Sequence, residues 1–352
     1  MSLRITISTL FAGFCLAMMP SLAIAQGNAQ QLSDLLRQGR ELVTAGNFDQ
    51  ALQLYQQAAQ LDARNPRIFS AIGFIYAQQK QYGPAAQAYQ QAIALDGTNP
   101  DFYYALGFNL GMTSENHGAA AAYRQAIRLN PRYVQAYQGL AVILARLGDT
   151  QTAIQTYRQI IVMEPRNWEA FQSLGILYLN QGDANQALTA LRQASQFVPN
   201  NPNVQLNLGQ ALLQSGDKTQ GLAALEQAAS LGQGDGNIQL TVGKVFLLQN
   251  NYQGAIRAFQ RATQLLPNSI LAYVGLGETW MMLKQPHEAV LPYQTVTRLT
   301  PNNPEAFYNL GVALKASGRK RESREALKVS ESLYKAQGNK EGIQKVKNAM
   351  KN

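Results

Sequence analysis

Residues 168–201 read WEAFQSLGILYLNQGDANQALTALRQASQFVPNN, and this stretch contains one complete structural unit. Its first half places apolar residues such as Leu174 and Tyr178 at helical spacing, and a polar, Gly-containing break follows. The second half repeats the helical spacing until Pro199 ends it. Asp183 stands directly before the second half, where a helix N-cap belongs. The stretch therefore predicts two helices joined by a tight turn.

The same unit recurs along the chain at an interval of 34 residues, without insertion or deletion. A small residue occupies the eighth place of every copy, and Ala, Gly or Ser occupies the twentieth place. These two places predict a close crossing of the paired helices, because only minimal side chains fit there. A Tyr, Phe or Leu at the twenty-fourth place is predicted to fill the space toward the next copy. Nine copies fit, and they begin at Leu32, Pro66, Pro100, Val134, Trp168, Pro202, Gly236, Ile270 and Pro304.

These places, with the prolines that close five of the copies, resemble the signature of the tetratricopeptide-repeat (TPR) family, and the resemblance covers residues 32–337. It implies an all-α fold, a right-handed α-solenoid of nine helix-turn-helix units in which the first helix of each pair lines the concave face. Residues 338–352 place Val346 and Met350 on one face of a basic helix, which is typical of a capping helix. Each pair is expected to rely on its neighbours to bury its apolar faces.

Two copies depart from the pattern. Residues 111–118 replace the usual end of the first helix in the third copy, and residues 231–236 end the sixth copy without a proline. We therefore expect the chain to flex around residues 232–237 more than elsewhere.

Residues 1–25 have the features of a secretory signal peptide: Arg4, then an apolar run, then the small-x-small sequence ending at Ala25. Cleavage would leave a polar lead-in, residues 26–31, and a periplasmic or secreted protein. The alternative is a membrane anchor that is not cleaved, because the apolar run approaches the length that spans a bilayer. Cys15 is the only cysteine and lies in this segment, so a cleaved chain would have neither disulfides nor thiolate metal ligands.

The net charge of +9 is concentrated at the carboxyl end, where residues 315–352 hold 11 Lys and Arg against 4 acidic residues. A basic tail could contact anionic lipid headgroups at a membrane surface, or an acidic protein. The alternative is a solvated charged end that keeps the chain from stacking on its neighbours. Nucleic acid is disfavoured as a partner by the export signal. The five residues of the basic tail on the last repeat's second helix are Arg319, Lys320, Arg321, Arg324 and Lys328.

The sequence offers no convergent set of catalytic or metal-ligating groups. Its two histidines, His117 and His287, lie in turns of different copies, and acidic residues are spread at about two per copy, mostly at helix starts. We therefore predict a protein that is not an enzyme and has no cofactor and no metal site. An exported hydrolase or transferase is the alternative class, and it would require acid, base or nucleophile groups that come together.

The resemblance also assigns a peptide-binding groove to places two, five, six, nine, twelve and thirteen of the first helices. This surface is apolar and aromatic with amide groups between, which suits an extended or helical peptide. The alternative is that part of the stripe packs between helices. The residues are Phe74, Tyr104, Phe108, Met112, Val142, Ile176, Leu179, Gln210, Lys244, Glu278, Met281, Tyr308 and Asn309.

The predicted function is a non-catalytic exported scaffold that binds a protein or peptide during the assembly or maturation of an envelope or membrane complex. The architecture, an export signal followed by repeats, also resembles cyanobacterial periplasmic repeat factors associated with photosystem II precursor maturation and manganese delivery. That similarity gives the alternative of an assembly factor that carries a divalent metal such as manganese, although no metal-ligand motif in the sequence accompanies it.

Overall fold

The computed structural model describes residues 12–351, and within that range the chain is helical throughout, with no strand. The predicted all-α class is therefore confirmed. The predicted signal peptide falls partly on residues 1–11, which lie outside the described residues. The chain divides into two compact units, of which unit 1 ends at Pro165 and unit 2 begins at Arg166.

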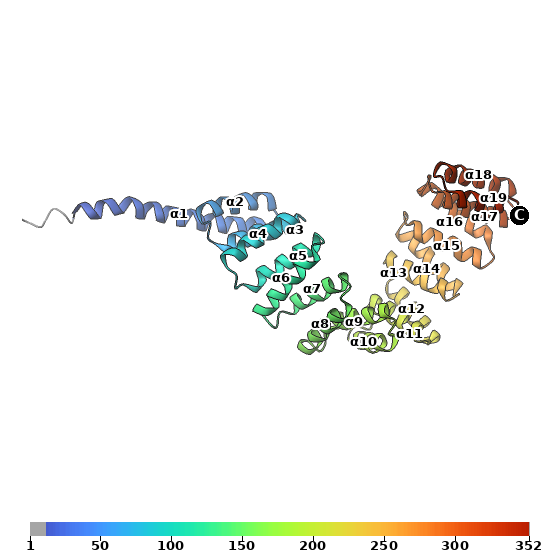
Figure 1. Cartoon of the computed structure of the whole chain (residues 1–352), viewed down its shortest axis with the longest axis horizontal. Helices are drawn as coiled ribbons and strands as arrows, with labels where there is room; N and C mark the ends of the chain where they lie inside the picture. Colours follow the sequence, from blue (N-terminus) through green and yellow to red (C-terminus); the bar gives the residue numbers. More distant parts are fainter. Residues whose placement is uncertain (1–11, 352) are drawn as a thin grey trace, which may run out of the picture. The chain divides into compact units, whose positions relative to one another are not determined.

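Unit 1 consists of antiparallel helix pairs in which each helix packs on the next one along the chain (Figure 1). The first helix is the longest, and it includes the predicted lead-in, residues 26–31, as helix. The helices are α1 (Ala12–Thr44), α2 (Phe48–Leu61), α3 (Pro66–Gln78), α4 (Tyr82–Leu95), α5 (Pro100–Met112), α6 (Asn116–Leu129), α7 (Val134–Arg146) and α8 (Thr150–Met163).

Unit 2 repeats this arrangement and ends with an additional helix, α19, that packs on α18. Its helices are α9 (Trp168–Gln181), α10 (Ala184–Phe197), α11 (Pro202–Gln214), α12 (Lys218–Leu231), α13 (Gly236–Leu248), α14 (Tyr252–Leu265), α15 (Ile270–Met282), α16 (Pro286–Leu299), α17 (Pro304–Ala316), α18 (Lys320–Ala336) and α19 (Lys340–Lys351). Every odd-numbered helix from α3 to α17 begins at the first residue of one of the sequence copies. Within residues 12–351, no helix is both long enough and apolar enough to cross a bilayer.

Most of the odd-numbered helices and some of the even-numbered ones begin at a short polar side chain that caps them. The side-chain oxygen of Asn65, for example, accepts a hydrogen bond from the backbone N–H of Arg67 at 3.1 Å, and Pro66 follows the cap directly. A proline at this first helical position gives up no intrahelical hydrogen bond. Asp183 accepts from the N–H of Gln186 at 3.1 Å, which confirms the predicted cap of α10.

Each turn within a helix pair contains one residue with a left-handed backbone, and these residues recur at the 34-residue interval. Five are glycines, which adopt this conformation without strain. Four carry a side chain, and for these the positive φ is unfavourable. The nine residues are Gly46, Lys80, Ser114, Gly148, Gly182, Gly216, Asn250, Lys284 and Gly318.

The close crossing predicted at the eighth place is confirmed where that place holds a glycine. A Cβ added at Gly73 would stand 2.8 Å from the ring of Tyr89, the large side chain at the twenty-fourth place. The twentieth-place residue faces the backbone of the same crossing, since the Ser323 hydroxyl donates to the carbonyl oxygen of Gly311 at 2.7 Å. The eighth-place glycine therefore leaves space for the large twenty-fourth-place side chain as well as for the close approach of the paired helix.

The large twenty-fourth-place side chains also reach the following pair, as predicted. A Cβ at Gly139 would stand 2.4 Å from Cζ of Tyr123, and a Cβ at Gly275 would stand 2.5 Å from Cζ of Phe259. One buried ring thus contacts two successive odd-numbered helices. The ring therefore packs neighbouring helix pairs together, and the hydrophobic core continues from one pair to the next.

The turn at residues 232–237, where flexing is predicted, is held by hydrogen bonds in place of the missing proline. The buried amide of Gln239 donates to the carbonyl oxygens of Ala229 and Gly232, at 2.6 and 3.1 Å. Arg261 Nε donates to the carbonyl oxygen of Gln233 at 2.8 Å. The division between the two compact units falls at Pro165, not at this turn.

Candidate functional site

In unit 1 the ninth place of three successive odd-numbered helices carries an exposed apolar side chain. Phe74 on α3, Phe108 on α5 and Val142 on α7 are 42%, 44% and 42% exposed, and Met112 at the end of α5 is also exposed. Large apolar side chains are ordinarily buried, so a row of exposed ones marks a surface that another molecule can cover. All four were predicted as groove residues.

One other predicted groove residue of unit 1, Tyr104, belongs to the chain's own packing. Its ring lies 5.1 Å from the ring of Tyr133 and 5.9 Å from that of Tyr123, measured between centroids. The Tyr133 hydroxyl in turn donates to Asp101 at 2.8 Å. Tyr104 therefore contributes to the stacking of helix pairs, the alternative that the sequence left open for part of the stripe.

A pocket of about 540 Å³ opens on this side of unit 1. Phe74 is the groove residue named above that lines it. The other lining residues, all but Tyr55, Tyr89 and Phe102, also occupy places that the resemblance assigns to the groove. These residues come from α1, α3 and α5 and from the inward rings of α2 and α4, and they are Arg40, Val43, Thr44, Tyr55, Ser70, Ala71, Tyr89, Asp101, Phe102 and Ala105.

A second pocket, of about 500 Å³, lies within unit 2 between α13, α15 and α17, with one ring from α16. It contains Glu278, Met281 and Asn309 from the predicted groove. The remaining lining residues are Leu247, Leu248, Asn250, Met282, Tyr293 and Val312. Leu247-Leu248 and Met281-Met282 occupy places twelve and thirteen of successive copies, two of the places that the resemblance assigns to the groove.

The unit 2 pocket combines one carboxylate with a mainly apolar lining. Leu248 and Met282 are 79% and 57% exposed at its rim. Although Glu278 remains accessible to solvent, burial by its surroundings raises the pKa of its carboxyl group. Burial also raises the pKa of the Tyr293 hydroxyl, and the charge of Glu278 raises it further, so the two groups lie close together.

The other predicted groove residues of unit 2 are separate from this pocket. Ile176 on α9 and Lys244 on α13 are exposed, and Gln210 and Leu179 are half-buried. Tyr308 is covered by the chain itself, because Lys345 Nζ of α19 lies 4.0 Å above the centroid of its ring. The ring also packs against the buried cluster that joins α18 to α19.

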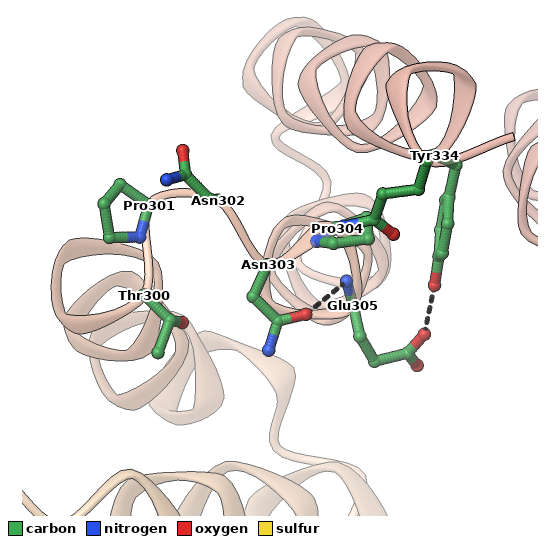
Figure 2. Close-up of a pocket in the computed structure, with 8 residues that line it drawn as sticks. Thr300, Pro301, Asn302, Asn303, Pro304, Glu305 and Tyr334 are labelled. Atoms are coloured by element: carbon green, nitrogen blue, oxygen red, sulfur yellow. Dashed lines mark hydrogen bonds between the residues drawn. The ribbon is translucent and has the colours of Figure 1, made fainter. Parts of the chain in front are cut away.

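A further pocket, of about 640 Å³, adjoins this cap at the turn between α16 and α17 (Figure 2). Its Glu305 accepts hydrogen bonds from Tyr334 and from Lys345, each at 2.6 Å. Burial alone would raise the pKa of Glu305, but these hydrogen bonds and the charge of Lys345 lower it overall. The carboxylate is therefore engaged in holding α19, and the pocket has a structural explanation.

The basic tail is partly neutralised within α18. Arg319 forms an ion pair with Glu322, and Arg321 Nε lies 3.3 Å from Glu325. Lys320, Arg324 and Lys328 are exposed, and none of them forms an ion pair with another described residue. Within residues 12–351, no group of three or more His, Cys, Asp or Glu side chains is arranged to hold a metal ion. His117 and His287 are exposed in different units.

Comparisons with known proteins match most of the chain to one type of repeat. One model described as "TPR repeat" matches residues 39–80, 75–111 and 285–318, and another described as "Tetratricopeptide repeat" matches residues 113–170. A model of the "Cytochrome c-type biogenesis protein H TPR domain" matches residues 158–273.

Individual proteins resemble the chain over shorter or more distant stretches. A TPR repeat-containing protein of Picosynechococcus sp. (strain ATCC 27264 / PCC 7002 / PR-6) is 50% identical over 48 residues, which span 14% of this chain and only 12% of that relative. The C-terminal part of a TPR repeat-containing protein from Cytophaga hutchinsonii has a TM-score of 0.56 at 15% identity and covers 68% of this chain and 98% of that chain. The APC/C hetero-tetramer Cut9–Hcn1 has a TM-score of 0.51 at 16% identity, over 80% of this chain and 55% of that chain. At these identities the two structures show the same fold.

Proposed function

The chain belongs to the tetratricopeptide-repeat family, and from this premise we propose that it is a non-catalytic scaffold that binds polypeptide on the odd-numbered helices of its two units. The observation that carries the proposal is the row of exposed apolar side chains at one place of the repeat, Phe74, Phe108 and Val142, beside a pocket of about 540 Å³. A pocket of this size is in the range of protein ligand sites, and an apolar lining with few polar groups suits side-chain anchors of a peptide.

The class of client follows from one of the matched families. Residues 158–273 match a domain of a protein that is described by its role in cytochrome c-type biogenesis. This match supports a role for the chain in the assembly or maturation of another protein. Together with the predicted export signal, it favours an envelope or membrane complex as the client.

Site-specific photo-crosslinking tests the binding surface. A photoreactive phenylalanine analogue is placed at Phe74 in unit 1 and at Met282 in unit 2, and at the exposed outward positions Gln91 and Gln260 as matched controls. We expect adducts with discrete client proteins from the first two positions and none from the controls. Equal adducts from all four positions, or adducts from the controls alone, would contradict the proposal.

Export is tested separately. We expect the mature protein to begin at Gln26, and we expect Ala23→Leu to block cleavage, because the small residues before the cleavage site are required by the signal peptidase. Intact mass of the protein from a fractionated Gram-negative host gives the N-terminus and the compartment together. An uncleaved chain in the membrane fraction would instead support the anchored alternative.

The metal-carrying alternative stays a prediction with its own measurement. Calorimetric titration of the purified protein with Mn²⁺ tests it directly. A site tighter than the millimolar range would support a carrier, and the crosslinking result would then show whether the scaffold role accompanies it.

A further inference from the structure

The pocket of unit 2 has one charged side chain that the fold leaves without a partner. The side-chain carboxylate of Glu278 forms neither a hydrogen bond nor an ion pair with another described residue. In contrast, most of the glutamates in helices α17 to α19 pair with Lys, Arg or Tyr side chains. The apolar surroundings raise the pKa of this carboxyl group although it stays open to solvent. A cation that enters the pocket can therefore reach the carboxylate and pair with it.

The surroundings of Glu278 determine what kind of cation fits. Leu248 and Met282 are largely exposed beside it, and Met281 and Val312 continue the apolar lining. A free metal ion or a small amine would leave these side chains in water. A polypeptide segment with apolar side chains on both sides of its charge would cover them and would gain from the burial.

The polar groups in the pocket favour arginine over lysine. The guanidinium group carries five N–H donors in one plane, so it can pair with a carboxylate through two bonds and still donate elsewhere. Asn309, which lines the pocket from α17, and the Tyr293 hydroxyl offer further acceptors near Glu278. Arginine is also more weakly hydrated than lysine, so it enters a partly apolar site at lower cost.

We propose that the unit 2 pocket binds a client segment in which one arginine, flanked by large apolar side chains, pairs with Glu278. This inference rests on the proposed scaffold function and specifies the client of one of its two pockets. Charge elsewhere on the protein does not produce the preference, because the chain as a whole carries +9 and repels a cationic peptide.

The experiment measures peptide binding to the purified full chain by fluorescence anisotropy. The probe is a short synthetic peptide in which one Arg is flanked on each side by two Leu residues in an Ala and Gln background. The matched probe replaces Arg with citrulline, which keeps the shape and removes the charge. We expect the Arg peptide to bind about tenfold more tightly, the effect of one partly desolvated ion pair.

Protein variants assign the preference to the pocket. We expect Glu278→Gln to abolish the difference between the two peptides, and Met282→Ser to weaken the binding of both. Glu288→Gln, at an exposed position of α16 outside the pocket, removes the same charge and is expected to leave the preference intact. All three positions are exposed, so the variants retain the fold, which circular dichroism verifies.

The pH provides a second readout. Glu278 and Tyr293 are the titratable groups that line the pocket, and no charged side chain of the packed helices α13, α14, α16 and α17 lines it. We expect the preference for arginine to be present at pH 7 and to be lost as the pH falls through the raised pKa of Glu278, because arginine stays charged while the carboxylate is protonated. The charged side chains of those helices are Lys244, Arg257, Arg261, His287, Glu288, Arg298, Glu305 and Lys315.

Three results would overturn the inference, and they leave different conclusions. Equal binding of the two peptides, or no binding while crosslinking still reports clients, would remove the arginine specificity and keep the scaffold. A preference that survives Glu278→Gln and is lost in Phe74→Ser would place the arginine site in unit 1. Concentration-dependent self-association of the wild type that Glu278→Gln abolishes would make a second copy of this chain the occupant.

Discussion

The glycine at the eighth place of the repeat lacks a Cβ, and this absence allows the helices of a pair to pack closely. At Gly73 a Cβ would meet the Tyr89 ring at 2.8 Å, and because that ring is buried, the ring or the helix backbone would have to shift. We expect Gly73→Ala to lower the free energy of unfolding by about 2 kcal/mol, the usual cost of overpacking. Gly83, on the adjacent helix α4 with no neighbour within 4 Å, is the matched control. There, alanine meets no neighbour, but it precedes Pro84 in the helix, so we expect a change of less than about 1 kcal/mol in either direction. Equal effects at both positions in urea unfolding would contradict the packing argument.

At the left-handed position of the turns, a substitution is expected to stabilise the protein. Lys80 has φ 60, where its Cβ is strained, whereas glycine occupies the equivalent place of five other turns. We expect Lys80→Gly to raise the free energy of unfolding by about 0.5–1 kcal/mol, since relief of strain exceeds the added entropy of the unfolded chain. The converse change, Gly182→Ala at φ 80, is expected to destabilise. Thermal unfolding of the two variants checks both signs, and a stabilising Gly182→Ala would refute the explanation.

At the scale of the element, the turn between α12 and α13 depends on one buried amide. Gln239 supplies hydrogen bonds to two carbonyl oxygens at the end of α12, where several other turns have a proline. We expect Gln239→Leu to cost about 1–2 kcal/mol, because the carbonyl oxygen of Ala229 loses its side-chain donor, while that of Gly232 still accepts from the N–H of Asp235. Hydrogen exchange should increase at residues 229–236 in this variant. Gln220→Leu, at an exposed position of α12, is the control and should leave exchange at the turn unchanged. Slow exchange at this turn in both variants would show that Gln239 is dispensable.

The cap helix α19 provides a prediction that depends on pH. Hydrogen bonds from Tyr334 and Lys345 keep the pKa of Glu305 below its ordinary value of 4.5 in the folded chain. A carboxyl group with a lowered folded pKa stabilises the fold above its unfolded pKa, and this contribution is lost as the pH falls through the folded pKa. Because the side chain is still partly exposed, we expect Glu305→Gln to cost only about 1 kcal/mol at pH 7.

Thermal unfolding at several pH values measures the contribution of Glu305 to the stability of the fold. The melting temperatures of wild type and Glu305→Gln should converge as the pH is lowered from 5 toward 3. Glu341→Gln, at an exposed position in the first turn of α19, loses only the weak interaction with the helix dipole and should differ from the wild type much less than Glu305→Gln. A difference between wild type and Glu305→Gln that widens at low pH would mean that the sign of the pKa shift is wrong.

These elements also show how much the sequence could predict. The 34-residue period predicted the helix pairs, the cap at Asp183 and the close crossing at the glycines, because each depends on local spacing alone. The role of Gln239 and the burial of Tyr308 under α19 were not predictable in the same way. Both depend on where a side chain from another helix ends, and period counting carries no such information.

On the scale of the whole molecule, period counting was again insufficient for the parts of the candidate site that depend on contacts between helices. Period counting predicted the exposed row of Phe74, Phe108 and Val142, because each is at the same place of its copy. It assigned Tyr104 to the groove by the same rule, yet neighbouring tyrosines cover that ring. The unpaired state of Glu278 became visible only when the surroundings of the pocket were known, since a repeat pattern does not record which charges find partners.

The architecture also determines how far a perturbation spreads. The contacts between helices are dominated by those adjacent or next but one in the chain, so each pair is stabilised chiefly by its immediate neighbours. We expect Gly73→Ala to increase hydrogen exchange in α2 to α6 and to leave α13 to α18 unchanged. Gly311→Ala, where a Cβ would stand 2.6 Å from Leu327, should give the reverse pattern in the same full chain. Mass spectrometry of the two variants side by side makes each the control for the other. An equal increase across both units from either substitution would mean that the chain unfolds as one cooperative body, and the nearest-neighbour description would then be wrong.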